Sequence, residues 1–236
     1  MAAKKRVAII GAGASGLTAI KCCLDEGLEP VCFEKTGQLG GLWCYRESEE
    51  ERDGLGCVFK STVINTSKEM MCFSDFPIPK EFPNYMHNTY VNRYFHMYTD
   101  AFGLREHIHL RTSVKMVTPT DDFDVTGRWS VDIEDRDANK AWTEIFDAVL
   151  VCNGHHTYPH VPHFEGLKGF RGEVVHTHDY KRPVGYEDKK VLVIGIGNSA
   201  CDAAVELSRT ASQVNNVVKS FLHSKFYYLR YRDVAL

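Results

Sequence analysis

The 236-residue chain contains no long hydrophobic run. Its apolar stretches are no longer than five residues, whereas a helix that spans a bilayer needs about 20 consecutive apolar residues. The first of these stretches, Val7–Ile10, is also too short for the apolar core of a secretory signal peptide. The sequence therefore predicts neither a spanning helix nor a cleaved leader.

The sequence also has no block of basic residues. Its 28 Lys and Arg and 31 Asp and Glu give a net charge of −3, and 44% of its residues are hydrophobic, as in an ordinary soluble globular protein. Proteins that bind nucleic acid usually carry a basic patch, so we expect no nucleic-acid partner. The eight cysteines follow no regular spacing, which indicates a reduced intracellular chain and no disulfide framework.

No residue set has the spacing of a metal site. Four histidines gather between residues 155 and 163, but Pro159 and Pro162 break any helix that would align them. No cysteine or carboxylate completes a ligand set beside them. We interpret these histidines as loop residues and predict no bound metal; a metal cluster is the alternative.

Two glycine-rich turns are present, each after an apolar run typical of a buried strand. Gly11-Ala12-Gly13-Ala14-Ser15-Gly16 follows Val7–Ile10, and Gly195-Ile196-Gly197-Asn198-Ser199-Ala200 follows Lys190–Ile194. In such a turn the first glycine permits the bend, the second lets a pyrophosphate approach the backbone, and the third small residue lets the next helix pack closely. The N-terminus of that helix attracts phosphate. Two turns predict a chain that holds two dinucleotides; turns that serve packing alone are the alternative.

An acidic residue follows the first turn at a suitable distance. We predict a helix over Ala14–Glu26, a stop near Gly27 and a strand over Pro30–Glu34. Glu34 lies 18 positions beyond Gly16, close to the spacing at which a carboxylate binds a ribose hydroxyl. After the second turn we predict a helix over Ser199–Ser208, with no such partner evident downstream.

The remaining pattern predicts an α/β fold with two dinucleotide-binding, Rossmann-like parallel-sheet domains and a small antiparallel meander, the second domain being incomplete. Gly37–Trp43 is either a loop that approaches a flavin or a plain turn, and residues 44–60 are charged and read as a surface excursion. The other predicted elements are a helix over Thr89–Phe102, meander strands over Ile108–Val114, Arg128–Ile133 and Ala141–Phe146, and a buried strand over Ala148–Cys152 that returns to the first domain. We expect the first dinucleotide-binding domain over residues 1–165, a linker and the start of the second dinucleotide-binding domain over 166–214, and a divergent tail over 215–236.

Three further motifs carry a family resemblance. They are Gly40-Gly41-Leu42-Trp43, Asn65-Thr66-Ser67-Lys68-Glu69-Met70 with Phe73–Pro77 after it, and Phe170–Lys181, which fits the pattern F-x-G-x-x-x-H-x-x-x-Y-K at every fixed position. With the two glycine turns, they make residues 4–214 resemble the flavin-containing monooxygenases, in particular the vertebrate microsomal members.

The resemblance implies an enzyme that uses FAD, NADPH and O2. It implies that a C4a-hydroperoxyflavin oxygenates soft nucleophiles, namely tertiary amines and sulfides, or in some members converts a ketone to an ester. Asn65 matches the family's amide beside the flavin and the nicotinamide, and is the catalytic candidate. The cofactor-binding candidates are Gly11, Ala12, Gly13, Ala14, Ser15, Gly16, Glu34, Leu42, Trp43, Asn65 and Thr66 for FAD, and Gly195, Gly197, Asn198, Ser199, Ala200, Cys201 and Asp202 for NADPH.

The resemblance also implies xenobiotic metabolism at the endoplasmic reticulum membrane, or a cytosolic protein if the chain ends at residue 236. Near Asn215 the sequence departs from the family, which continues into a Thr-Arg-Arg sequence whose arginine holds the 2′-phosphate of NADPH. A catalytically inactive FAD-binding remnant is therefore an alternative. A flavoenzyme resembling the disulfide reductases is another, although Cys44 and Cys57 are 13 positions apart and such enzymes use a closely spaced pair.

Overall fold

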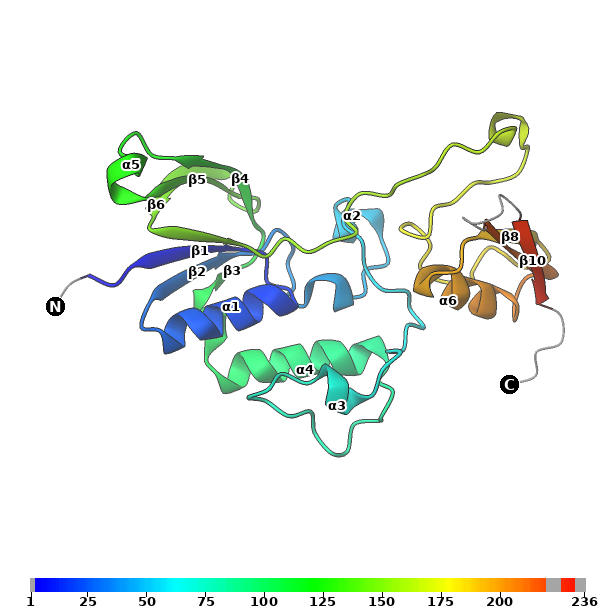
Figure 1. The fold of residues 1–236 in the computed structure, drawn as a ribbon, viewed down its shortest axis with the longest axis horizontal. Helices are drawn as coiled ribbons and strands as arrows, with labels where there is room; N and C mark the ends of the chain where they lie inside the picture. Colours follow the sequence, from blue (N-terminus) through cyan, green and yellow to red (C-terminus); the bar gives the residue numbers. More distant parts are fainter. Residues whose placement is uncertain (1–2, 220–225, 232–236) are drawn as a thin grey trace. The chain divides into compact units, whose positions relative to one another are not determined.

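The computed structural model describes residues 3–219 and 226–231, which fold as two compact units (Figure 1). Unit 1 consists of Met1–Val58 and Val63–Tyr158, and unit 2 of Phe59–Thr62 and Pro159–Leu236. Each of the two glycine turns lies in its own unit, as expected if each turn serves its own dinucleotide.

Unit 1 is built on a four-stranded parallel sheet with the order β3-β2-β1-β7. The strands are β1 (Arg6–Ile10), β2 (Glu29–Phe33), β3 (Ile108–His109) and β7 (Ala148–Val151). Strand β1 lies between β2 and β7, so its side chains are covered on both faces: Val7 and Ile9 point into one apolar cluster and Ala8 into another. This position explains the unbroken apolar run before the first turn.

Helices cover one face of this sheet. In Figure 1, α1 (Ala14–Asp25) and α4 (Asn88–Ala101) lie side by side below it, and the short η2 (Leu104–His107) follows α4. The helical spacing predicted over residues 89–102 is confirmed, because Val91, Tyr94, Phe95 and Tyr98 are all buried against the sheet and α1. Three shorter helices, η1 (Gly41–Trp43), α2 (Glu49–Arg52) and α3 (Lys68–Met71), lie in the connections.

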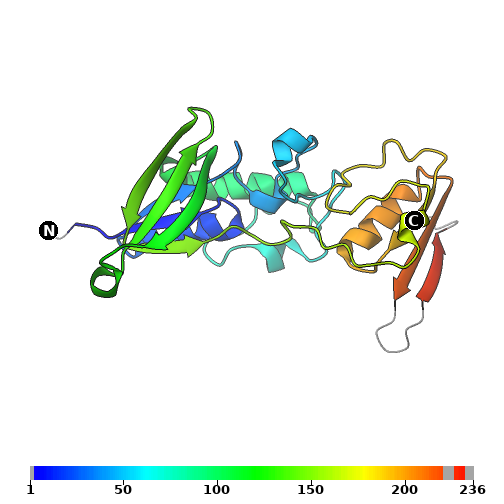
Figure 2. The same ribbon diagram turned by 90° about the horizontal axis from the view of Figure 1, so that it is seen from above.

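An antiparallel meander covers the other face (Figures 1 and 2). It consists of β4 (Thr112–Pro119), β5 (Trp129–Asp135) and β6 (Lys140–Phe146), with the helical turn α5 (Phe123–Thr126) between β4 and β5. The predicted first strand, Ile108–Val114, was wrong. Ile108 and His109 belong to the parallel sheet as β3, and the meander starts only at Thr112. Between them Arg111 has a φ of 53°, which no continuous strand accommodates.

For two other segments, the predicted solvent exposure was wrong. The strand predicted over Ala148–Cys152 was expected to be buried, but β7 is the last strand of its sheet in this unit, and Leu150 and Val151 are 38% and 69% exposed. Residues 44–60 were predicted to be a surface excursion, yet Arg46, Arg52 and Cys57 are buried.

Unit 2 contains a three-stranded sheet with the order β10-β9-β8 and one helix packed on it. The elements are η3 (Leu167–Gly169), β8 (Lys190–Ile194), α6 (Asn198–Leu207), β9 (Gln213–Lys219) and β10 (Phe226–Tyr231). Strands β8 and β9 are parallel and β10 is antiparallel to β9. The strand-turn-helix-strand order is that of a partial Rossmann-type fold, as predicted. Of the predicted divergent tail, residues 220–225 and 232–236 lie outside the described residues.

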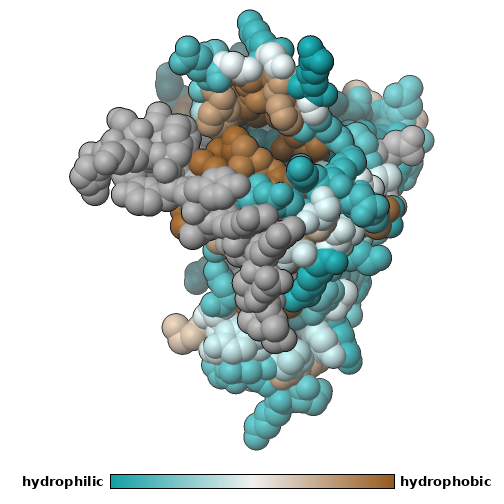
Figure 3. Space-filling model, turned by 90° about the vertical axis from the view of Figure 1, so that its right-hand side faces the viewer, coloured by the Kyte–Doolittle hydropathy of each residue, from teal (hydrophilic) through white to brown (hydrophobic). Residues whose placement is uncertain are grey.

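Some apolar side chains of unit 2 are not covered. Leu192 and Ile194 in β8 are 55% and 48% exposed, and Ile196 in the turn is 62% exposed. Figure 3 likewise shows apolar surface open to solvent on the face that it presents. Within the described part of the chain, no helix combines the length and apolarity that a membrane crossing requires.

Candidate dinucleotide-binding sites

The first glycine turn has a backbone that only glycine fits at two positions. Gly11 has a φ of +101°, and a Cβ atom there would lie 2.6 Å from the carbonyl oxygen of Cys152. A Cβ on Gly16 would lie 1.8 Å from the carbonyl oxygen of Gly11. The third glycine therefore lets α1 begin directly against the turn, which is the role predicted from its spacing.

Among the residues that the structure describes, no hydrogen bond pairs the first amides of helix α1. The first helical hydrogen bond is donated by the Leu17 amide to the Gly13 carbonyl oxygen at 3.0 Å, so the amides of Ala14, Ser15 and Gly16 precede it. Gly13 occupies the N-cap position without a side-chain cap, and the first turn of the helix contains no acidic residue. Amides of this kind, at the positive end of the helix dipole, favour a bound phosphate.

A second glycine loop lies against the first. The Gly40 amide donates to the Ala12 carbonyl oxygen at 2.9 Å, and a Cβ on Gly41 would lie 3.0 Å from the Gly13 Cα atom. Leu42 and Trp43 follow in η1, half-buried, and Trp43 packs against the core that contains α1. The predicted loop over residues 37–43 is thus part of the same site as the first turn.

Glu34 joins this site from the end of β2. Its side chain is 6% exposed; Oε2 accepts from the Ala12 amide at 2.8 Å, and Oε1 accepts from the Thr36 amide at 2.8 Å and the Thr36 hydroxyl at 2.7 Å. A carboxylate accepts about four hydrogen bonds, so these three contacts leave capacity for a ribose hydroxyl.

Two residues of this network were missed by the sequence analysis. They are Thr36 and Arg46, whose Nη2 donates to the Thr36 hydroxyl at 3.1 Å. No spacing rule links them to the turn. The only indication in the sequence was that the Thr36 hydroxyl comes two positions after Glu34, the carboxylate predicted to bind the ribose.

Asn65 lies outside this network. It is exposed, and among the described residues no hydrogen bond joins its side chain to the first turn or to Glu34. Thr66 beside it is half-buried. The neighbouring Lys68 Nζ donates to the carbonyl oxygens of Pro79, Lys80 and Phe82 at 3.1, 2.8 and 2.7 Å, and this holds the Asn65 motif against the loop over residues 79–82.

The second turn repeats the geometry of the first at the helix start. Gly195 has a φ of +131° and its amide donates to the Val217 carbonyl oxygen of β9 at 3.0 Å. The first hydrogen bond of α6 runs from the Cys201 amide to the Gly197 carbonyl oxygen at 3.0 Å. The amides of Asn198, Ser199 and Ala200 precede it, again with an uncapped glycine at the N-cap position.

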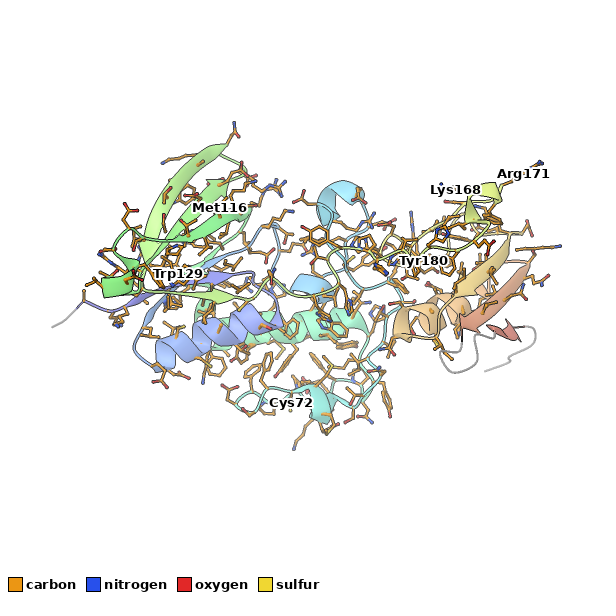
Figure 4. The ribbon with its side chains drawn as sticks, turned by 45° about the horizontal axis from the view of Figure 1, so that its top comes forward. Cys72, Met116, Trp129, Lys168, Arg171 and Tyr180 are labelled. Atoms are coloured by element: carbon orange, nitrogen blue, oxygen red, sulfur yellow. The ribbon has the colours of Figure 1, made fainter. Side chains whose placement is uncertain are left out.

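Acidic residues follow further along α6. Burial, together with the nearby Glu206, raises the pKa of the Asp202 carboxyl. Glu206 Oε2 accepts from the Tyr180 hydroxyl at 2.5 Å, and the Tyr180 ring (labelled in Figure 4) meets Phe59 edge-on at 5.0 Å between centroids. Tyr180, a fixed position of the Phe170–Lys181 motif, therefore packs the segment over residues 59–62 within unit 2.

Across the described chain, no three His, Cys, Asp or Glu side chains gather as a metal site would require.

A family model described as "Flavin-binding monooxygenase-like" matches residues 4–223. The chain belongs to this family. This match confirms the resemblance that the motifs indicated. It ends at residue 223, nine residues beyond residue 214, where the resemblance was expected to end.

Among the known relatives, flavin-containing monooxygenase 5 of Rattus norvegicus is 54% identical over 214 residues, 90% of this chain. The enzyme named dimethylaniline monooxygenase [N-oxide-forming] 2 of Mus musculus is 50% identical over 89% of this chain. The chain spans 39% of the length of each of these relatives.

The chain also resembles a solved structure. The solved structure of S-allyl-L-cysteine S-oxygenase from Allium sativum is similar with a TM-score of 0.83 and 29% identity, over 93% of this chain and 52% of that one. This likeness confirms the α/β architecture that was predicted for the chain from its sequence.

Proposed function

We propose that the chain acts as an NADPH- and O2-dependent flavoprotein monooxygenase, with FAD at the first turn and NADPH at the second. The observation that carries this proposal is the pair of uncapped helix N-termini, each behind a glycine turn. At the first of them Glu34 and a second glycine loop complete a site whose donors and acceptors suit a dinucleotide. Family membership supports the flavin.

Each candidate residue has a proposed part in holding these cofactors. The amides of Ala14–Gly16 bind the FAD pyrophosphate, and Glu34 accepts from its ribose. Leu42 and Trp43 lie along the flavin, with Thr66 beside it. The amides of Asn198–Ala200 bind the NADPH pyrophosphate, and Cys201 and Asp202 line the same helix end.

The chemistry itself is supplied by the cofactor. Reduced flavin, when bound, provides the electrons that activate O2. The chain has to orient the two cofactors and exclude water. Asn65 is proposed to lie beside flavin and nicotinamide, where an amide both donates and accepts. We include in this proposal the route of oxygen activation that the family resemblance implies in the sequence analysis above.

The proposed substrates are tertiary amines and sulfides. The names of the mouse relative and of the Allium sativum protein denote N-oxide formation and S-oxygenation, which supports both classes. By the same resemblance we propose the endoplasmic reticulum as the location. A flavin-binding chain without turnover is the second candidate, because the chain spans only 39% of the length of the relatives named above.

Visible absorbance of the purified chain, before and after anaerobic addition of NADPH, tests the proposal. A bound yellow flavin that is bleached by NADPH is the expected result, and amines and sulfides would then be screened by product formation. A yellow chain that NADPH does not bleach would favour the candidate without turnover. A colourless chain that takes up no added FAD would overturn the proposal.

A further inference from the structure

Arg46 is a buried cation within the site of the first turn. Its side chain is 4% exposed, although it lies in a stretch of charged residues. A buried guanidinium is costly unless an opposite charge or hydrogen bonds compensate it. Among the residues whose side chains the structure describes, no carboxylate pairs with it directly.

Glu34 is the matching buried anion. It is 6% exposed, and in the described part of the chain it also has no direct ion pair. The two charges are joined by one hydroxyl: Arg46 Nη2 donates to Thr36 Oγ1 at 3.1 Å, and Thr36 Oγ1 donates to Glu34 Oε1 at 2.7 Å. Such a chain of hydrogen bonds is strengthened by its low-dielectric surroundings.

The same guanidinium has a second contact at the turn. Nη1 donates to the Gly41 carbonyl oxygen at 3.2 Å, and Gly41 is the residue that lies against Gly13. Arg46 therefore contacts both parts of the chain that border the first turn, the end of β2 through Thr36 and the second glycine loop through Gly41.

We propose that Arg46 is a positioning residue for dinucleotide binding: through the Thr36 hydroxyl it fixes the Glu34 carboxylate that receives the ribose of the adenosine half. This inference rests on the proposed FAD site. The arginine itself does not touch the nucleotide. Its effect is on the adenosine end of FAD, because Glu34 is the group that it orients.

Arg46→Gln, Arg46→Lys and Thr36→Val test the proposal by titration of the apoprotein with FAD and with FMN, which lacks the adenosine. We expect Arg46→Gln and Thr36→Val each to raise the Kd for FAD about 10-fold, the loss of one hydrogen bond to a charged group, and to change the Kd for FMN less than about twofold. Arg46→Lys keeps the charge but has a single donor nitrogen, and should recover part of the FAD affinity. In the Arg46→Gln/Thr36→Val double variant the losses should not add, since both remove one chain of contacts.

Arg52→Gln is the matched control. Arg52 is also buried, and its side chain bonds to the Ser48 carbonyl oxygen and to the Glu49 carboxylate, both in the neighbouring helical turn, so Arg52→Gln should leave the Kd for FAD unchanged. Equal weakening of FAD and FMN by Arg46→Gln, or an unchanged Kd for both, would overturn the proposal.

Hydrogen exchange of the apoprotein separates this inference from the proposed function. The amides of Ala12 and Thr36 both donate to Glu34, so Arg46→Gln should speed their exchange while the amides of α4 exchange as before. If the unaltered chain takes up no FAD, the proposed function fails, and the exchange rates still decide whether Arg46 orients Glu34. Unchanged rates at both amides would refute that link.

Discussion

Backbone sterics at the first turn require glycine at single positions. This is why the spacing of the glycines in the sequence predicted the turn. Gly11 adopts a φ of +101°, and Gly16 leaves 1.8 Å between a would-be Cβ and the Gly11 carbonyl oxygen. Only glycine fits at either position, so the glycine pattern in the sequence follows directly from the local backbone geometry.

The corresponding prediction is that Gly16→Ala destabilises unit 1. The new Cβ would meet a backbone oxygen that cannot turn away, so we expect a loss of about 3 kcal/mol in the free energy of unfolding by urea, the upper range for overpacking. Gly197→Ala in the second turn is the control, because nothing lies within 4 Å of its would-be Cβ. It should change stability by less than about 0.5 kcal/mol, yet weaken the binding of NADPH. A Gly16→Ala chain as stable as the unaltered one would contradict this account.

Arg46 shows why other residues of the site could not be predicted. Charged stretches such as residues 44–60 are usually solvated, and a buried arginine becomes tolerable only where the fold supplies partners. Here Thr36 and Gly41 supply them. That information lies in tertiary contacts between loops, which no spacing within the sequence expresses, whereas Glu34 could be named from its distance to Gly16 alone.

At the scale of elements, segments with a clear periodic or apolar pattern were predicted, and the two-residue strand β3 was not. Helix α4 has four buried apolar residues at helical spacing, and β1 has a continuous apolar run. Strand β3 has only two residues and ends just before Arg111, whose left-handed backbone turns the chain into β4. A change of sheet within four residues leaves no period to detect.

One element-scale prediction concerns the loop beside the Asn65 motif. Lys68→Met removes three hydrogen bonds from Nζ to the carbonyl oxygens over residues 79–82. We expect a loss of about 2 kcal/mol, typical of contacts made by a charged donor, and faster exchange of the Ile64 and Lys68 amides, which donate to residues 86 and 84. Lys80→Met, an exposed lysine of the same loop, is the control. Equal exchange rates in both variants would show that Lys68 does not hold the loop.

At the scale of the whole molecule, the chain does not divide at a single point. Residues 59–62 lie in unit 2, although the chain on both sides of them belongs to unit 1. Phe59 is buried against Tyr180, and the Lys60 amide donates to the Lys181 carbonyl oxygen at 2.9 Å. A boundary drawn along the sequence, such as the expected one after residue 165, cannot represent a segment of four residues that crosses between units, because so short a segment carries no composition signal of its own.

This crossing predicts how a cleaved chain behaves. Lys168 and Arg171 are exposed and project from the segment around η3 (Figure 4), so a specific protease site inserted between them can be cut without loss of core contacts. We expect the two fragments to elute together in size-exclusion chromatography, because residues 59–62 of the first fragment remain packed in unit 2. Phe59→Ala removes a buried aromatic ring, a change that costs about 3–5 kcal/mol, and should let the fragments separate, whereas Val63→Ala, at a side chain 47% exposed, should not. Separation of the unaltered fragments would mean that the segment contributes too little to hold unit 2 together.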